Sequence, residues 1–208
     1  MARYLSIHPE DPQPRMLGQA AEILRSGGVV AIPTDSCYAL GCGLGDKDAV
    51  ERIRRIREVD DRHHLTLMCR DLSEIAQFAR VDNAQYRLLK ATTPGSYTFI
   101  LEGTKELPRR VLHPKRKTIG LRVPDHKVAL ARLAELGEPL LTSTLMLPGD
   151  ESPLTEGWEI QDRLDDLIEL ILDGGYCGTE PTTVVDLTNW PPELVRAGRG
   201  SLEPFGFE

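Results

Sequence analysis

Aromatic residues are scarce in this 208-residue sequence, at 5%, so aliphatic side chains must supply most of the packing in the core. Hydrophobic residues make up 40% and charged residues 27%, which is ordinary for a globular protein. The length suits one large domain. We therefore predict a single domain over residues 1–208, with its core running from about residue 14 to about residue 201.

Long apolar runs are also missing. No stretch reaches membrane-spanning length without charges, and the first residues have no apolar segment of the kind found in signal peptides. The four cysteines, Cys37, Cys42, Cys69 and Cys177, form no CxxC pair, and no histidine lies at zinc-finger spacing from them. We expect a soluble, cytoplasmic protein with reduced thiols, no membrane partner and no structural metal.

Basic residues are in the minority, 25 against 32 acidic ones, and the net charge is −7. This balance argues against a general nucleic-acid coat protein, because such binding depends on Lys and Arg meeting phosphates. The basic residues are nevertheless clustered, in an arginine-rich stretch over residues 52–62 and in Lys115-Arg116-Lys117. The three consecutive cations are either a solvated loop or a contact for phosphate or an RNA backbone.

Hydrophobic periodicity predicts helices over residues 15–26, 46–57, 71–79, 82–91, 126–136 and 158–172. It predicts strands over residues 4–8, 29–33, 65–69, 97–101, 118–123, 140–144, 183–187 and 194–198. Strands and helices interleave, but no clear helix separates 97–101 from 118–123. We therefore predict an α/β (α+β) protein with a mixed parallel and antiparallel sheet and flanking helices.

Polar residues follow two of these strands. Residues 33–42, PTDSCYALGC, begin at the end of a buried strand, and the strand 140–144 ends in three hydroxyl residues. Strand ends are common ligand sites in α/β folds, although the same residue types also form ordinary turns. Arg57 ends its helix beside an acidic loop, where a guanidinium is placed to reach a phosphate. No Walker A, GxGxxG, nucleophile-elbow or HExxH motif is present, so any nucleotide site is of another type.

The order of these segments resembles that of the YrdC family of threonylcarbamoyl-adenylate synthases. PTDSCYALGC is similar to the family's PTDTxYGLGC, and further similar segments follow in family order at residues 94–101, 118–124, 142–144, 181–187 and 195–198. The resemblance spans nearly the whole chain. It implies a twisted mixed sheet curled round an open cleft with a basic lining.

Enzymes of this family condense L-threonine, bicarbonate and ATP, which carries Mg²⁺, into threonylcarbamoyl-adenylate and release pyrophosphate. The product serves the modification of adenosine 37 in tRNA. By resemblance, Thr34, Tyr38 and Arg122 would contact the substrate, with Arg122 at its carboxylate. The nucleotide would be bound by Arg57, Thr144, Thr182 and Arg196. Arg57 and Thr34 would serve the catalytic step.

Two motifs differ from the family pattern. Its Lys-x-Arg-Pro corresponds to Arg57-Glu58-Val59-Asp60, and its Ser-x-Asn corresponds to Thr144-Leu145-Met146. These departures resemble the YciO-type branch. We therefore predict a nucleotide-binding protein with weakened or altered nucleotidyltransferase activity, in which loss of one clamp cation slows the reaction.

Two alternatives remain open. The first is a non-catalytic module for tRNA or double-stranded RNA, with Lys115, Arg116 and Lys117 as contacts. The second is a relative that binds another small anion.

Overall fold

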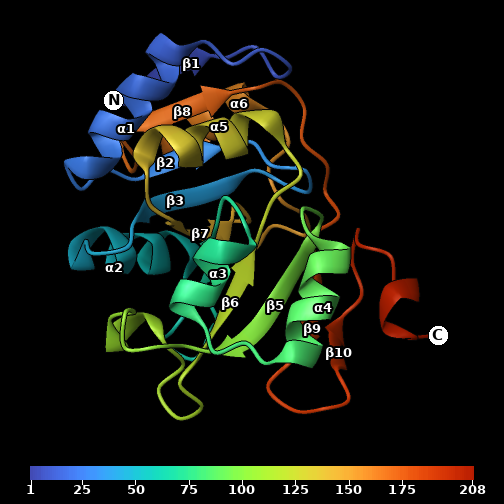
Figure 1. The fold of residues 1–208 in the computed structure, drawn as a ribbon. Helices are drawn as coiled ribbons and strands as arrows, with labels where there is room; N and C mark the ends of the chain where they lie inside the picture. The colour runs from blue at the N-terminus through green and yellow to red at the C-terminus, as the bar shows by residue number, and fades with distance from the viewer.

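The computed structural model describes residues 1–208 and places ten strands in one sheet, in the order β1-β8-β2-β3-β7-β4-β6-β5-β9-β10 (Figure 1). The strands are β1 (Arg3–Ser6), β2 (Val30–Ile32), β3 (Ala39–Gly43), β4 (Thr66–Met68), β5 (Tyr97–Glu102), β6 (Thr118–Arg122), β7 (Leu140–Thr144), β8 (Leu170–Asp173), β9 (Thr183–Asp186) and β10 (Glu193–Arg196). The helices are α1 (Pro14–Arg25), α2 (Lys47–Arg57), α3 (Leu72–Phe78), α4 (Asn83–Thr92), α5 (Lys127–Leu136) and α6 (Gly157–Leu164), with short 3-10 turns η1 (Arg109–Val111) and η2 (Glu203–Phe205).

The sheet is mixed, as predicted. β1 and β2 both run parallel to β8, and β4–β6 and β5–β9 are parallel pairs as well. The remaining neighbours, β2–β3, β3–β7, β4–β7, β5–β6 and β9–β10, are antiparallel. The antiparallel pair β5–β6 confirms that no crossover helix joins these two strands, since only η1 lies between them.

Two hydrophobic clusters hold the sheet between layers of helices. In the smaller one, α1 and α5 pack over β2, β7 and β8, through side chains such as Leu17, Leu133 and Ile32. In the larger one, α2, α3, α4 and α6 pack against the strands through residues such as Ile53, Ile75 and Leu89. Figure 1 shows α1 and α5 over the upper strands and α3 and α4 in front of β5 and β6. No helix is long and apolar enough to cross a membrane.

Strand alternation leaves one face of β5, β6 and β9 uncovered by the core. Phe99 and Leu101 on β5, with Ile119 and Leu121 on β6, belong to the larger core. The alternate side chains of the same strands point the other way. Thr98, Ile100, Arg122 and Val184 are among them, and they line a cavity.

The predicted helix over residues 158–172 is wrong in its second half. The helix ends at Leu164, and Leu170–Asp173 is strand β8, which lies between β1 and β2. Leu167, which helical periodicity over 158–172 would place on the inward face, is 49% exposed. Ile168 and Ile171 are buried, but the latter belongs to a strand.

Strand β3 was not predicted, since its residues were assigned to the polar segment 33–42. It pairs with both β2 and β7. Glycine is depleted in strands because it adds no packing side chain. Position 41 requires glycine for a steric reason, because a Cβ there would lie 2.6 Å from the Leu140 side chain.

Candidate functional site

A cavity of about 670 Å³ lies over the open face of the sheet, and we call it the cleft. Its walls come from the turn before β3, the end of α2, the loop before β4, and strands β5, β6, β7, β9 and β10. Among its lining residues are four arginines, Arg57, Arg62, Arg122 and Arg196, and one carboxylate, Glu151. The cleft is therefore cationic in a chain whose net charge is −7.

Arg57 is held in place at the cleft wall by three contacts. Its Nε donates to the Met146 carbonyl at 3.2 Å, and its Nη1 donates to Ser143 Oγ at 2.6 Å. Nη1 also lies 3.4 Å from His63 Nε2. Burial lowers the pKa of Arg57, and the nearby Arg196 lowers it further. Two fixed like charges facing one cavity create a site for an anion.

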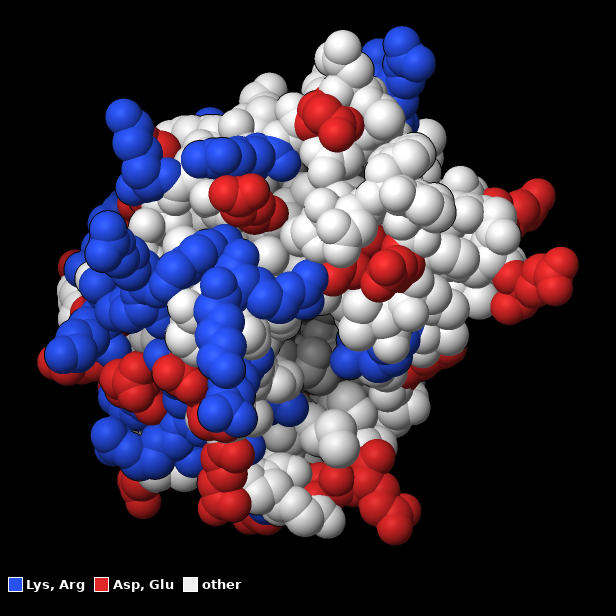
Figure 2. Space-filling model, turned by 90° about the horizontal axis from the view of Figure 1, so that it is seen from below, with Lys and Arg blue, Asp and Glu red and all other residues white.

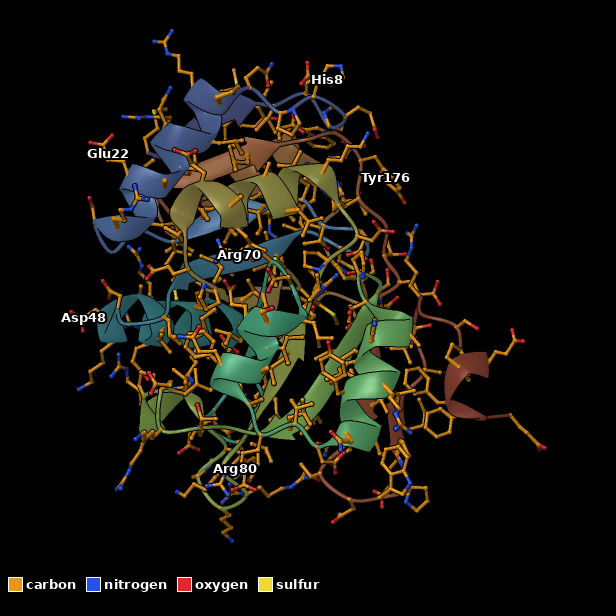
Figure 3. The ribbon with its side chains drawn as sticks, in the orientation of Figure 1. His8, Glu22, Asp48, Arg70, Arg80 and Tyr176 are labelled. Atoms are coloured by element: carbon orange, nitrogen blue, oxygen red, sulfur yellow. The ribbon has the colours of Figure 1, made fainter.

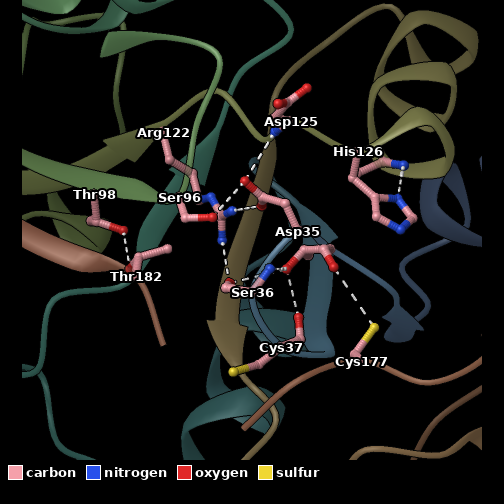
Figure 4. Close-up of polar contacts among 12 residues, drawn as sticks. Asp35, Ser36, Cys37, Ser96, Thr98, Arg122, Asp125, His126, Cys177 and Thr182 are labelled. Carbon is pink, nitrogen blue, oxygen red and sulfur yellow. Dashed lines mark hydrogen bonds and ion pairs between the residues drawn. The ribbon is translucent and has the colours of Figure 1, made fainter. Parts of the chain in front are cut away.

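Arg196 is positioned by Thr182, the residue just before β9. Its Nη2 and Nε donate to the Thr182 carbonyl at 2.8 and 3.2 Å, and Nη2 lies 3.3 Å from Thr182 Oγ1. Thr182 Oγ1 in turn lies 2.8 Å from Thr98 Oγ1 on β5 (Figure 4). Gly198 permits this approach, because a Cβ there would lie 2.3 Å from the Pro181 carbonyl. The late segments of the chain therefore place a cation and a hydroxyl in the cleft, next to a second hydroxyl from β5.

Arg122 reaches the cleft from β6 but is already paired. Its Nη2 forms an ion pair with Asp35, and its Nη1 lies 3.4 Å from Ser36 Oγ (Figure 4). Asp35 also accepts from Ser96 Oγ at 2.9 Å and from the Asp125 backbone N–H at 3.1 Å. Nε of Arg122 is buried without a partner. The PTDSCYALGC segment thus orients the arginine that the resemblance assigns to a substrate carboxylate.

Thr34 and Tyr38 belong to the same turn, between β2 and β3. Thr34 does not line the cleft: its Oγ1 donates to the Cys37 carbonyl at 2.6 Å and it is 4% exposed. Tyr38 lines the cleft, and its hydroxyl donates to the Gly175 carbonyl at 2.6 Å. Burial raises the pKa of the neighbouring Cys37 thiol to about 11, which keeps it protonated. The roles assigned to Thr34 and Tyr38 stay predictions.

Thr144 lines the cleft at the end of β7, and its role in nucleotide binding stays a prediction. Met146, which stands where the family pattern has an asparagine, also lines it and holds Arg57 through its backbone carbonyl. Val59, which stands in place of the second motif cation, lies outside the cleft, in a separate surface depression beside Arg54. The arginine of the phosphate motif is therefore retained, and its second cation has no counterpart at Val59.

Two histidines of the cleft, His63 and His64, were missed by sequence reasoning, and Ser143 was noted only as part of the hydroxyl strand 140–144. His64 Nε2 lies 2.8 Å from Thr118 Oγ1, and its ring stacks on His113 with centroids 5.3 Å apart. Burial lowers the pKa of His64 to about 4, and that of His63 is also lowered by burial and by Arg57. Ser143 anchors Arg57. The only signals in the sequence were the position of His63 and His64 beside the acidic loop and that of Ser143 within the hydroxyl strand.

Lys115, Arg116 and Lys117 do not line the cleft. All three are exposed, and Arg116 pairs with Asp186 at 2.5 Å. Figure 2 shows Lys and Arg side chains gathered over one side of the face seen from below, beside a central hollow. Arg116 lines a different surface depression, together with Arg80 and Glu102. The side chains of Arg80 and Glu102 form an ion pair at 3.5 Å. Figure 3 shows Arg80 at the lower end of the molecule.

The fold and cleft define a protein of the YrdC class. The family model described as "Telomere recombination" (Sua5, YciO and YrdC) matches residues 22–198, and the chain belongs to this family. It is 56% identical over 205 residues to the Escherichia coli protein YciO, covering 99% of this chain and all of that protein. The crystal structure of Escherichia coli YciO superposes with a TM-score of 0.96, again covering 99% of this chain and 100% of that one. The predicted family and its YciO-type branch are thereby confirmed.

The chain is also a distant relative of threonylcarbamoyl-AMP synthases. It is 34% identical over 188 residues to that enzyme of Pyrococcus abyssi, covering 88% of this chain and 54% of the enzyme. The crystal structure of Pyrococcus abyssi Sua5 complexed with L-threonine superposes with a TM-score of 0.87 at 28% identity, over 95% of this chain and 58% of that one. This chain thus spans a little over half the length of these two proteins.

Proposed function

We propose that the protein binds ATP in the cleft and transfers its adenylyl group to a carboxylate-type oxygen, as in threonylcarbamoyl-adenylate synthesis. The observation that carries this proposal is the convergence of Arg57 and Arg196 on one cavity that also holds Ser143, Thr144 and Thr182. Fixed guanidinium groups and hydroxyls are the donors that bind a polyphosphate. The kinship to threonylcarbamoyl-AMP synthases supports the same conclusion.

The chemistry requires little covalent work from the protein. The amino group of L-threonine and bicarbonate form a carbamate with loss of water, and one carbamate oxygen bonds to the α-phosphorus of ATP as the bond to the β-phosphate oxygen breaks. Pyrophosphate leaves with the electron pair of that bond. Negative charge grows on the phosphate oxygens, and preoriented cations stabilise it. Arg57, fixed by Ser143 and Met146, and Arg196, fixed by Thr182, meet this requirement.

Arg122 is the candidate for the carboxylate of the amino acid. A guanidinium pairs with a carboxylate through two parallel hydrogen bonds, and the buried position of Arg122 strengthens such a bond. Asp35 occupies part of its donor set. No group of three or more His, Cys, Asp or Glu side chains is arranged to hold a metal ion. In this proposal Mg²⁺ enters the cleft with ATP, as part of the substrate.

Calorimetric titration with ATP and Mg²⁺, with and without L-threonine and bicarbonate, tests this function. We expect ATP to bind, to bind more tightly when both co-substrates are present, and pyrophosphate to be released only then. Arg57→Ala should weaken binding at least tenfold, since a hydrogen bond to a charged group contributes about 1.5–3 kcal/mol. Arg55→Ala, which removes an exposed arginine from the same helix, is the matched control. Equal affinities of both variants and the parent would refute the site.

One observation favours RNA binding as a second candidate: the gathering of cations on the face in Figure 2. Lys115 and Lys117 are exposed in the loop before β6. A tRNA or double-stranded RNA bound there should dissociate steeply with salt, because phosphate contacts release counterions. The variant Lys115→Ala with Lys117→Ala should lower the salt slope by about two if each contacts one phosphate. Unchanged RNA binding by this variant would exclude these contacts.

A further inference from the structure

In the cleft, His63 contacts Arg57, and this contact depends on the protonation state of the imidazole. Nη1 of Arg57 carries two hydrogens, and Ser143 Oγ, at 2.6 Å, accepts one of them. The other faces His63 Nε2 at 3.4 Å. A guanidinium only donates, so Nε2 must be the unprotonated, accepting nitrogen of a neutral imidazole.

The surroundings of His63 keep it neutral when the cleft holds no anion. Partial burial lowers its pKa, and so do the charges of Arg57, Arg196 and Arg54, while Asp60 acts in the opposite direction. Arg54 and Arg57 belong to α2, Asp60 to the loop after it, and Arg196 to β10. Arg62 and Glu151 line the same cleft. The three cations disfavour the protonated ring more than Asp60 favours it, so His63 is neutral.

A polyphosphate bound at Arg57 reverses this balance. Its charges lie next to Arg57 and Arg196 and offset the repulsion that disfavours an imidazolium. Since the two nitrogens are 3.4 Å apart, one phosphate oxygen can lie within reach of both Arg57 Nη1 and His63 Nε2. The protonated ring then donates to the ligand instead of accepting from Arg57.

We propose that His63 is a proton-coupled phosphate ligand, which takes up a proton from solvent when a polyphosphate binds and thereby supplies a second cation beside Arg57. The inference rests on the proposed function for the location of the phosphates. Val59, in place of the second cation of the family motif, lies outside the cleft, whereas His63 lies inside it beside Arg57 and becomes a cation only on binding. Phosphate affinity then depends on pH. A Lys or Arg in place of His63 would stay charged and would give no such dependence.

The direction of the pH dependence follows from the two protonation states. Binding raises the pKa of His63, so the affinity increases as pH falls through the higher, ligand-bound pKa. It levels off below the lower, ligand-free pKa. Between the two, one linked proton changes the affinity up to about tenfold per pH unit. His63→Gln keeps a neutral acceptor for Arg57 but takes up no proton, so this part of the slope should vanish.

The test uses the full chain with two probes, ATP and inorganic pyrophosphate. The pKa of His63 is followed by NMR with and without each probe, and His63→Gln assigns its resonance among the five histidines. We expect a pKa below the ordinary value in the free protein and a rise past it with either probe. Calorimetry in two buffers of different ionisation enthalpy should detect proton uptake that His63→Gln lacks. His8→Gln, on the loop between β1 and α1 at the upper edge in Figure 3, should retain it.

The outcomes separate this inference from the proposed function. Binding of ATP with an unchanged His63 pKa overturns the inference and leaves the function standing. Binding of pyrophosphate with a raised His63 pKa, but no binding of ATP, supports the inference and refutes adenylyl transfer. Failure of both probes to bind overturns both. A ligand-free pKa that does not rise in Arg57→Gln also overturns the inference, because the contact then has no effect on the ring.

Discussion

Arg122 and Asp35 form an ion pair whose side chains are only 7% and 9% exposed, and it links the turn before β3 to the end of β6. Asp35 extends the contact to Ser96 and to the backbone of Asp125. One carboxylate therefore ties together three separate segments around the cleft. A carboxylate ligand of Arg122 must share the guanidinium with this internal partner.

The first prediction concerns this pair. Asp35→Ala leaves the buried Arg122 charge uncompensated, so the free energy of unfolding should fall by about 3–5 kcal/mol in urea denaturation. Glu10→Ala removes one partner of an exposed ion pair with Lys127 and should leave the unfolding midpoint unchanged. Equal effects of the two substitutions would show that Asp35 is not needed to neutralise Arg122.

The second prediction concerns the anchor of Arg57. Ser143→Ala removes the 2.6 Å hydrogen bond to Arg57 Nη1. We expect MgATP affinity to drop by about 1 kcal/mol, or roughly fivefold, because the guanidinium is then less well oriented. Calorimetric titration measures this change, and thermal unfolding should show that stability is little affected. Ser73→Ala, at an exposed position of α3, should leave the affinity as it is.

The fold was largely predictable, because most of its strands and helices have the hydrophobic periodicity of a half-buried element. The exception at residues 158–172 has a physical reason. Ile160, Leu164, Ile168 and Ile171 recur at helical spacing, but the last belongs to β8, whose residues 170–172 are fully buried. Pairing of β8 with β1 and β2 on either side overrides this local pattern, and a sequence window does not contain those partners.

The lining of the candidate cleft was predictable only where residue type and position in a motif agree. Arg57, Arg196, Thr144 and Thr182 line one cleft although they are far apart in the sequence. Thr34 shows the limit: its hydroxyl bonds within its own turn, which sequence alone does not distinguish from a ligand contact. The contact of Arg57 with Ser143 depends on the distance between α2 and β7, which no local pattern encodes.

The third prediction concerns pH. Burial lowers the pKa of His64 to about 4 in the folded state, so the unfolded chain binds a proton more readily. Its contribution to stability is present above the ordinary histidine pKa of about 6.5 and is lost as pH falls toward 4. Because the ring is partly exposed, we expect this loss to be on the order of 1–2 kcal/mol.

Urea denaturation of the parent and of His64→Gln over this pH range measures the effect. The glutamine does not titrate, so its unfolding free energy should fall less steeply with acid than that of the parent. His8→Gln, which changes an exposed histidine, should follow the parent curve. Parallel curves for the parent and His64→Gln would contradict the buried, neutral state of His64.

The last prediction concerns Arg132 on α5, which is fully buried and has no hydrogen-bond partner for Nε, Nη1 or Nη2. Burial lowers its pKa to about 10, and Arg25 adds repulsion. An unpaired buried charge costs stability, and apolar replacements of similar volume often recover it. Arg132→Met should therefore raise the free energy of unfolding by about 1–3 kcal/mol, measured by urea denaturation. Arg87→Met, at an exposed position of α4, should not. A less stable Arg132→Met protein would show that the guanidinium stabilises the fold at this position.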